Sequence, residues 1–414
     1  MNSNKNKECK QEIKNVNKMD ANKIKNLEKK HIMQNYARFN LVLESGKDVY
    51  VSDKNGKKYL DFIAGIACVP AGHSNKNVAN AIINQAKKLI QVSNLYYTEP
   101  QAVLAEKLAK MAGSNGPKKS FFCNSGAEAN ESAIKLAKKI TKKTDFIVCE
   151  NAFHGRTHAS LAATWKEKYK TPFMPLVEGF TFVKFDNAAE IKKNITKKTA
   201  AVIIEPIQGE AGVNIPKQGY LKQVSKICKD NKILLILDEV QTGNGRTGKF
   251  FAYQHEGIKP DIVTTAKGLA NGVPIGVCMS DYEFDKGDHG STFGGNCIAS
   301  AAANATIDEI VGKNLMKNAE KIGKYFSSEL KKIPRLKNVR GKGLMIGADI
   351  LAMNGKSKID AKKIVEKCID HGLLINNTSE TSLRFLPPLT ITKKHVDEAI
   401  KILKIAIKES EANS

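Results

Sequence analysis

Between residues 121 and 280, short apolar runs alternate with longer segments in which apolar residues recur at helical spacing. The runs predict strands buried on both faces, at 146–149, 180–185, 201–204, 233–237, 262–264 and 275–279. The longer segments, 127–143 and 219–231, carry lysines on their outward positions and predict covering helices. This alternation indicates an α/β fold whose mostly parallel sheet has helices on both faces.

The flanking segments predict additional, more mixed structure. Before the core, the pattern predicts a short meander at 48–62 with a turn at Asn55 and Gly56, and helices at 78–90 and 101–111. After it come predicted helices at 297–311, 315–330, 361–370 and 395–407, and strands near 345–350 and 383–385. We therefore expect a disordered Lys- and Asn-rich tail at 1–30, an N-terminal segment at 31–75 joining the small domain, a large domain at 76–300 and a small α+β domain at 301–414.

The chain is strongly basic, with a net charge of +24, and only six of its 66 basic residues are arginines. The lysines are spread over the predicted helices and nowhere alternate with aromatic residues, so we do not expect nucleic acid as a partner. No signal peptide and no apolar run long enough to span a membrane is present in the sequence, which favours a cytoplasmic protein without a membrane partner. Because arginine is rare, each arginine marks a position where lysine would not serve.

Cysteine and histidine patterns do not indicate a metal site. The eight cysteines form no C-x-x-C pair, and the eight histidines form no H-E-x-x-H motif. His154 and His158 have helical spacing but no third ligand close by in the sequence, so no metal is expected.

Two polar residues lie just after the ends of predicted buried strands. Asp238 follows the strand at 233–237, and Lys267 follows the strand at 262–264. Open α/β sheets bind their ligands at the carboxyl ends of their strands. A carboxylate buried there needs a cationic partner. A lysine shielded from water there becomes nucleophilic. Each residue also has a structural interpretation, as a helix cap or ion pair for Asp238 and as a solvated side chain for Lys267.

A third feature is the segment N-S-G-A-E-A-N-E at 124–131. Ser125 and Glu128 have the spacing of a capping box, which predicts a helix start whose first backbone N–H groups are open to a phosphate. A capped helix without a ligand would have the same pattern.

A phosphate site, an acid that can hold a protonated ring nitrogen and a nucleophilic amine are together what pyridoxal 5'-phosphate requires. A chain that combines these three features resembles the class III, fold-type I aminotransferases. The resemblance extends from about residue 36 to the C-terminal helix. The motifs are F-F-C-N-S-G-A-E-A-N-E (121–131), F-H-G-R-T (153–157), E-P-I-Q-G-E (205–210), D-E-V-Q-T-G-x-G-R-T-G (238–248), A-K-G (266–268), H-G-S-T-F-G-G-N (289–296) and L-R-F-x-P-P-L (383–389). The resemblance implies a mostly parallel, seven-stranded-type sheet and a smaller α+β domain.

The resemblance also implies the cofactor contacts. Lys267 and Asp238 would be catalytic, Lys267 by bonding to the cofactor and Asp238 by pairing with its ring nitrogen. The other implied contacts are Ser125, Gly126 and Ala127 at the phosphate, Phe153 on the ring face, Glu239, Val240 and Gln241 beside the ring, and Thr292 at the cofactor of a neighbouring subunit. A homodimer with sites at its interface follows from this pattern.

For the substrates, the family pattern implies that Arg156 and Arg384 bind carboxylates and that Ser291 lies near the substrate. Glu210 would pair with Arg384 in one half-reaction and release it in the other. Within the family the chain is most similar to the acetylornithine and ornithine branch. This implies transfer of an amino group from N2-acetyl-L-ornithine to 2-oxoglutarate, giving N-acetyl-L-glutamate 5-semialdehyde and L-glutamate in arginine biosynthesis.

Other functions remain open at this point. Ornithine, succinyl-diaminopimelate or a lysine precursor on an acidic carrier protein could be the amine donor, or the enzyme fold could serve as a basic binding module. The sequence departs from the family pattern at 68–73 and 75–77, which leaves substrate contacts near the entrance open.

Overall fold

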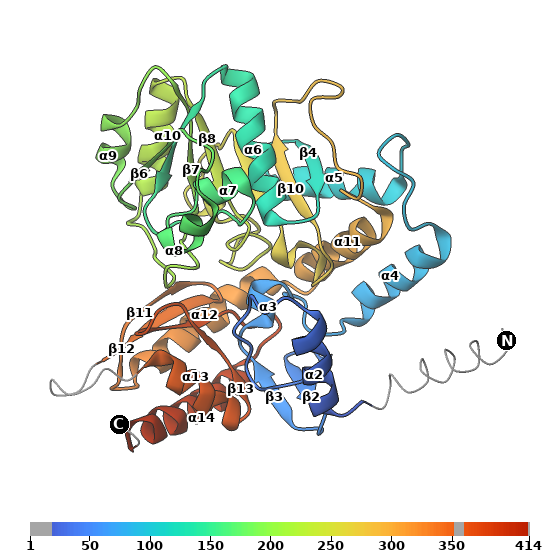
Figure 1. The fold of residues 1–414 in the computed structure, drawn as a ribbon, viewed down its shortest axis with the longest axis vertical. Helices are drawn as coiled ribbons and strands as arrows, with labels where there is room; N and C mark the ends of the chain where they lie inside the picture. Colours follow the sequence, from blue (N-terminus) through green and yellow to red (C-terminus); the bar gives the residue numbers. More distant parts are fainter. Residues whose placement is uncertain (1–18, 352–359, 413–414) are drawn as a thin grey trace.

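The computed structural model describes residues 19–351 and 360–412, and these residues form two packed parts (Figure 1). The upper part in Figure 1 holds a seven-stranded sheet, and the lower part brings blue N-terminal segments beside red C-terminal ones. Within the described ranges, no helix is both long and apolar enough to cross a membrane.

The large sheet has the strand order β4-β10-β9-β8-β7-β5-β6, and only β10 runs antiparallel to its neighbours. Its strands are β4 (Lys119–Cys123), β5 (Asp145–Cys149), β6 (Phe180–Val183), β7 (Thr199–Ile204), β8 (Leu234–Asp238), β9 (Ile262–Thr265) and β10 (Gly276–Ser280). Every apolar run predicted as a strand forms one, which confirms the mostly parallel α/β sheet.

Successive residues of these strands pack on opposite faces of the sheet. Ile147 and Cys149 of β5 join one hydrophobic cluster, and Phe146 and Val148 join another. The helices of this part are α4 (Lys76–Lys88), α5 (Glu99–Ala112), α6 (Gly126–Thr141), α7 (His158–Ala162), α8 (Glu167–Lys170), α9 (Ala188–Lys193), α10 (Tyr220–Asp230) and α11 (Cys297–Gly312), with 3-10 helices η2 (Thr171–Phe173), η3 (Ala252–His255) and η4 (Lys267–Ala270). Residues of α6 belong to one cluster and residues of α5, α10 and α11 to the other, so both faces are covered.

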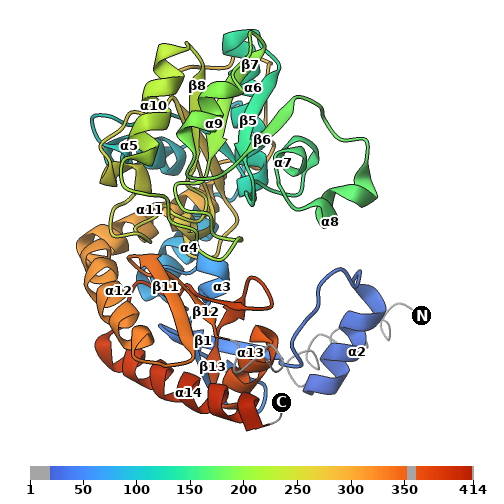
Figure 2. The same cartoon turned by 90° about the vertical axis from the view of Figure 1, so that its left-hand side faces the viewer.

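The smaller part contains two sheets and joins distant segments of the chain (Figure 2). The sheets are formed by β1 (Leu43–Lys47), β2 (Tyr50–Asp53), β3 (Lys58–Asp61) and β13 (Leu373–Leu374), and by β11 (Leu336–Lys342), β12 (Met345–Ile350), β15 (Ser382–Phe385) and β14 (Asn376–Asn377). Its helices are α3 (Ala64–Ala67), α12 (Leu315–Lys331), α13 (Ala361–Asp370) and α14 (Lys393–Ala412). Parallel pairing of β3 with β13 and a shared hydrophobic core connect the N-terminal segment to the C-terminal one.

The structure differs from the predicted domain plan at two places. Part of the tail expected to be disordered forms α2 (Ala21–His31), whose first turn is capped by Asp20 accepting the N–H of Lys23 at 2.8 Å; residues 1–18 lie outside the described residues. No residue of α2 is buried. The predicted boundary at residue 300 cuts α11, which packs along α4 and α5, and we propose that the joint lies after Gly312.

Candidate active site

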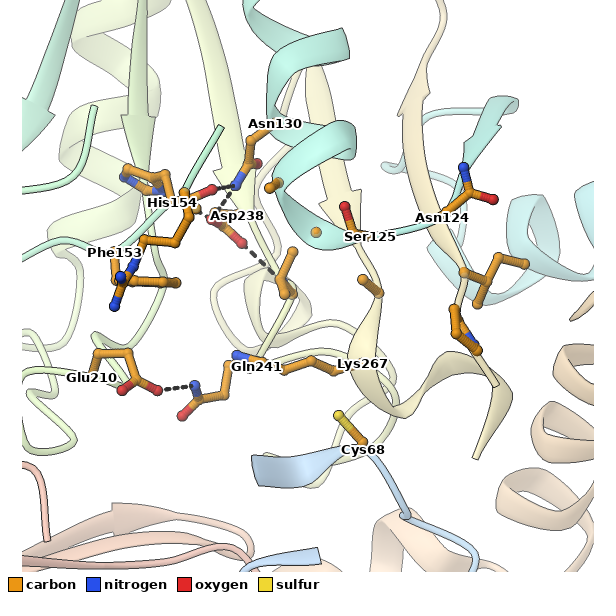
Figure 3. A pocket seen from close by; sticks show the side chains of 18 of the residues that line it. Cys68, Asn124, Ser125, Asn130, Phe153, His154, Glu210, Asp238, Gln241 and Lys267 are labelled. Carbon is orange, nitrogen blue, oxygen red and sulfur yellow. Dashed lines mark hydrogen bonds and ion pairs between the residues drawn. The ribbon is translucent and has the colours of Figure 1, made fainter. Parts of the chain in front are cut away.

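A cavity of about 440 Å³ opens at the carboxyl ends of the parallel strands (Figure 3). Its lining residues come from the start of α6, from the loops after β5, β7 and β8, and from the turn after β9. Cys68 of the N-terminal segment lines it as well. Open α/β sheets bind their ligands at this edge.

Asp238, the last residue of β8, is buried at the centre of a hydrogen-bond network. Its Oδ2 accepts from Asn130 Nδ2 at 2.8 Å and lies 2.8 Å from His154 Nδ1, and its Oδ1 accepts the N–H of Val240 at 3.0 Å. Burial opposes charge on His154, but the hydrogen bond and charge of Asp238 raise the pKa of His154 above its usual value. Asp238 therefore favours the protonated form of His154, which is its hydrogen-bonding partner in the buried wall of the site.

Glu205, which follows β7, adds a second buried acid to this wall. Its carboxyl group accepts the N–H of Phe153 at 3.0 Å and the N–H of Gly209 at 3.1 Å. Burial raises the pKa of Glu205 to about 7, against the opposing charge of His154. Burial therefore favours the neutral form of Glu205, which would limit the negative charge beside Asp238.

Lys267 begins η4 directly after β9, with a φ of +42°. This left-handed backbone conformation costs energy for a residue with a Cβ, and such strain is common at functional sites. The next residue must be small, because a Cβ at Gly268 would lie 3.0 Å from the carbonyl oxygen of Ala67. The Lys267 side chain lines the cavity and forms no hydrogen bond or ion pair with any residue in the described ranges. The backbone thus presents an unpaired amine to the cavity.

The N-terminus of α6 also lines the cavity (Figure 3). Ser125 Oγ accepts the N–H of Glu128 at 3.2 Å, as expected for a cap. The Glu128 carboxylate accepts the N–H of Asn124 at 2.7 Å, one residue before the N–H that a capping box uses. A Cβ at Gly126 would lie 2.7 Å from Val240 Cγ1, so only glycine lets the start of α6 lie this close to Val240. The helix start suits an anion such as phosphate.

Arg384 of β15 approaches the cavity from the smaller part of the chain and is 1% exposed. Its NH1 group donates to Glu210 Oε1 at 2.6 Å and to Gln241 Oε1 at 3.3 Å, and Gln241 Nε2 donates to Glu210 at 3.2 Å. Burial opposes the charge of Glu210, but Arg384 lowers the pKa of that carboxyl. Glu210 and Gln241 line the cavity and hold Arg384 behind them.

Comparison with known proteins identifies the family. The family model for aminotransferase class-III matches residues 32–407. The chain is a class-III aminotransferase. Its relatives include acetylornithine aminotransferases of Archaeoglobus fulgidus, 47% identical over 380 residues, and Methanocaldococcus jannaschii, 48% identical over 393 residues. Each alignment covers 91% of this chain, and 98% and 96% of the two relatives respectively.

Solved structures place the aminotransferase in fold type I. The ornithine aminotransferase of Toxoplasma gondii matches with a TM-score of 0.90 at 31% identity, over 96% of this chain and 97% of that one. The acetylornithine aminotransferase of Elizabethkingia anophelis matches with a TM-score of 0.82 at 34% identity, over 94% and 100%. Class-III aminotransferases use pyridoxal 5'-phosphate, and the unpaired amine of Lys267, the buried Asp238 and the open start of α6 fit that group.

Most of the predicted site residues of the aminotransferase meet at the cavity: Ser125, Gly126, Ala127, Phe153, Arg156, Glu210, Asp238, Val240, Gln241 and Lys267. Glu239, predicted to contact the cofactor, does not line it. Its fully buried carboxyl group accepts the N–H of Tyr253 at 2.8 Å and the hydroxyl of Thr242 at 2.5 Å. Burial raises the pKa of Glu239 to about 7. The side chain points elsewhere because neighbouring residues at a strand end face opposite ways.

Ser291 and Thr292 also lie outside the cavity of the single chain. Ser291 Oγ accepts the N–H of Gly294 at 3.0 Å and lies 3.3 Å from Nδ2 of Asn124, which lines the cavity. Thr292 is exposed, and its carbonyl oxygen accepts a hydrogen bond from Gln91. Contact of Thr292 with the cofactor of a neighbouring subunit stays a prediction.

Sequence reasoning missed His154, Asn130 and Glu205 as site residues of the aminotransferase. All three stand inside motifs that were recognised, but motif membership gave them no role. His154 had been considered only as a metal ligand with His158. Polar residues that follow or face predicted buried strands were the available signal, because such groups need partners once buried.

Proposed function

We propose that this aminotransferase transfers the terminal amino group of N2-acetyl-L-ornithine to 2-oxoglutarate. The observation that carries the proposal is the unpaired Lys267 amine in one cavity with the Asp238–His154 pair and the open α6 terminus. The names of relatives at 42–48% identity, all acetylornithine aminotransferases, support the choice of donor. A place in arginine biosynthesis and a cytoplasmic location follow as predictions.

Residues of this chain would hold the phosphate, one ring face and the ring nitrogen of the cofactor. Backbone N–H groups of Gly126 and Ala127, with Ser125, would bind its phosphate, and the Phe153 ring would cover one face of the pyridine. Asp238 would keep the ring nitrogen protonated, with His154 compensating its charge. When bound, the cofactor supplies an electron sink for the carbanion that transamination requires.

Lys267 then serves as the acid and base of the reaction. Its Nζ takes the proton from the carbon that bears the reacting amine, and in the return half-reaction it delivers a proton to the carbon that becomes the α-carbon of glutamate. Because Nζ has no partner among the described residues, it is available for this transfer.

Glu210 would let one cavity accept two kinds of substrate. While it is paired with Arg384, the guanidinium is neutralised and the donor, with its carboxylate on Arg156, can enter. When Glu210 releases Arg384, the guanidinium can grip a carboxylate of glutamate or 2-oxoglutarate with two parallel hydrogen bonds.

We expect Glu210→Ala to separate the two half-reactions. Glutamate and 2-oxoglutarate should react at least as well as before, and the efficiency ratio of the half-reactions should shift about tenfold or more, because a charge-assisted pair contributes roughly 1.5 to 3 kcal/mol. Stopped-flow measurement of each half-reaction tests this. Glu167→Ala, which removes an acid whose side chain is 77% exposed on α8, is the control. Equal changes in both half-reactions would make Glu210 merely structural.

We further propose a homodimer in which Thr292 reaches the partner's cofactor. Four large apolar side chains are exposed in the single chain. Phe293 is next to Thr292 in the sequence, and Leu95, Tyr96 and Tyr97 lie in the loop before α5. Covering such a surface favours association. Sedimentation equilibrium should give the mass of two chains, and a monomer at micromolar concentration would contradict the proposal.

The donor is tested by comparing kcat/KM for N-acetylornithine, ornithine and N-succinyl-diaminopimelate with 2-oxoglutarate as acceptor. We expect N-acetylornithine to have the highest value. Ornithine is the second candidate, since ornithine aminotransferases are among the matching structures. A chain whose activity is absent with all three donors would favour the basic binding module.

A further inference from the structure

Asn130 is a buried polar residue on the face of α6 that covers the sheet. Ala133, Ile134 and Ala137, further along the same face of the helix, belong to the apolar cluster between α6 and the strands. Asn130 itself is 3% exposed. Burying an amide in such a layer costs free energy unless its hydrogen-bonding groups have partners. A polar residue at an apolar position of this pattern therefore needs a functional or structural reason.

Both N–H bonds and the oxygen of the Asn130 amide have partners. Nδ2 donates to the carbonyl oxygen of His154 at 2.7 Å and to Asp238 Oδ2 at 2.8 Å. Oδ1 accepts the hydroxyl of Thr264 at 2.7 Å. Because two acceptors lie beside Nδ2, the amide is stable only with its N–H bonds toward Asp238. Thr264 is fully buried and pairs with Asp238 in the register of β8 and β9, so the sheet places this hydroxyl beside Asn130.

These contacts leave the Asp238 carboxylate one open acceptor position. A carboxylate accepts hydrogen bonds at about four positions, two on each oxygen. Oδ2 accepts from Asn130 and lies 2.8 Å from His154 Nδ1, and Oδ1 accepts the N–H of Val240 at 3.0 Å. Among the residues that the structure describes, no donor reaches the second position of Oδ1, and Asp238 lines the cavity (Figure 3). A protonated ring nitrogen would take this position.

An aspartate side chain does not hold such an orientation by itself. Its terminal torsion is broad, so intrinsic preferences leave the plane of the carboxylate free to rotate. Asn130 and His154 both bind Oδ2, and a rotation of the carboxylate would break both hydrogen bonds. Asn130 is in turn held by Thr264, which lies on the strand next to Asp238.

Helix α6 also connects this contact to the phosphate site. Asn130 is four residues after Gly126, whose N–H would bind the phosphate in the proposed function. The two positions therefore share one face of the helix and lie about 6 Å apart along its axis. One rigid element thus relates the position of the acid at the ring nitrogen to the position of the phosphate.

We propose that Asn130 is the positioning residue of Asp238: supported by Thr264, it holds the carboxylate so that Oδ1 faces the ring nitrogen of the cofactor. Asn130 acts through Asp238 and takes no proton itself. The inference rests on the proposed contact of Asp238 with the ring nitrogen. Removing the amide should therefore weaken binding of a ring that carries a proton on nitrogen more than binding of a ring that lacks this nitrogen.

The experiment measures affinity rather than turnover. Its probes are pyridoxamine 5'-phosphate and the analogue in which carbon replaces the ring nitrogen, since neither has an aldehyde that could bond to Lys267. Fluorescence titration of the full-length, cofactor-free chain gives the Kd of each probe. Asn130→Leu keeps a similar size and removes both N–H donors. We expect it to raise the Kd of the nitrogen-containing probe about tenfold or more, and that of the carbon analogue less than about threefold.

Variants of Thr264 provide a milder form of the same test. Thr264→Val leaves the oxygen of Asn130 without its partner and should raise the Kd of the nitrogen-containing probe about two- to fivefold, whereas Thr264→Ser keeps the hydroxyl and should match the wild type. Thr265→Val is the matched control. Thr265 is the next residue of β9, is equally buried, accepts from Asn244 Nδ2 at 3.2 Å and does not line the cavity. This variant should not discriminate between the probes.

Asp238→Asn separates the possible failures. If it raises the Kd of both probes equally, the contact with the ring nitrogen is wrong, and the role of Asn130 is wrong with it. If Asp238→Asn discriminates between the probes but Asn130→Leu and Thr264→Val do not, Asn130 is only structural and the role of Asp238 stands. Thermal denaturation shows whether Asn130→Leu is folded, and if it is not, the difference between Thr264→Val and Thr264→Ser decides. Neither outcome changes the proposed amine donor.

Discussion

Lys267→Ala should abolish transamination, lowering kcat by at least about 10⁴-fold. The substitution would remove both the proposed covalent attachment of the cofactor and the only amine that the described residues place at the cavity without a partner. The visible absorption band that arises when the cofactor is joined to a lysine should disappear, although the cofactor can still bind through α6 and Asp238. Stopped-flow kinetics and an absorption spectrum of the purified variant measure the two effects.

Lys249→Ala is the matched control, since this exposed lysine lies in the loop after β8 and does not line the cavity. It should keep wild-type activity and the wild-type spectrum. Added methylamine should restore part of the lost proton transfer in Lys267→Ala and have no effect on the control. Turnover of the alanine variant at the wild-type rate would show that another group supplies the amine, and the assignment of the site would fail.

The sequence was sufficient to predict the large sheet because its strands are buried on both faces. Continuous apolar runs such as 201–204 and 233–237 are typical of strands buried on both faces, and both form strands, as Thr199–Ile204 and Leu234–Asp238. By contrast, β11 has only one buried residue, Leu336, and was not predicted, since its residues Leu336–Lys342 include three charged side chains and no apolar run. Two-residue strands such as β13 depend on a distant partner and leave no local pattern.

The active site was predictable only in part for a similar reason. Asp238 and Lys267 could be selected because each lies at or just beyond the carboxyl end of a buried strand, β8 and β9 respectively. The partner of Asp238 could not, because His154 is 84 residues earlier in the chain and reaches it only through the pairing of β5, β7 and β8. Glu239 was misplaced because a motif specifies identity and order, whereas the direction of a side chain depends on backbone geometry at the strand end.

Asp238→Asn should slow both half-reactions by about 10³-fold without unfolding the protein. Asparagine keeps the size of aspartate but lacks the charge that would hold a proton on the cofactor's ring nitrogen, and losing one preorganised electrostatic contact typically costs 10² to 10³ in rate. The change also removes the charge that raises the pKa of His154, so His154 should become neutral at a higher proton concentration than in the wild type. Stopped-flow kinetics with each substrate measure the rates.

Glu239→Gln provides the control, because Glu239 is the next residue, is equally buried, and lies outside the cavity. Any effect of this second variant should appear in thermal stability, since its carboxyl group bonds Thr242 and Tyr253, and kcat should remain within about twofold of the wild type. The comparison isolates the position of the charge from the mere loss of a buried acid. If the two variants lost activity equally, the damage would come from disturbing the end of β8, and the role of Asp238 at the ring nitrogen would have to be abandoned.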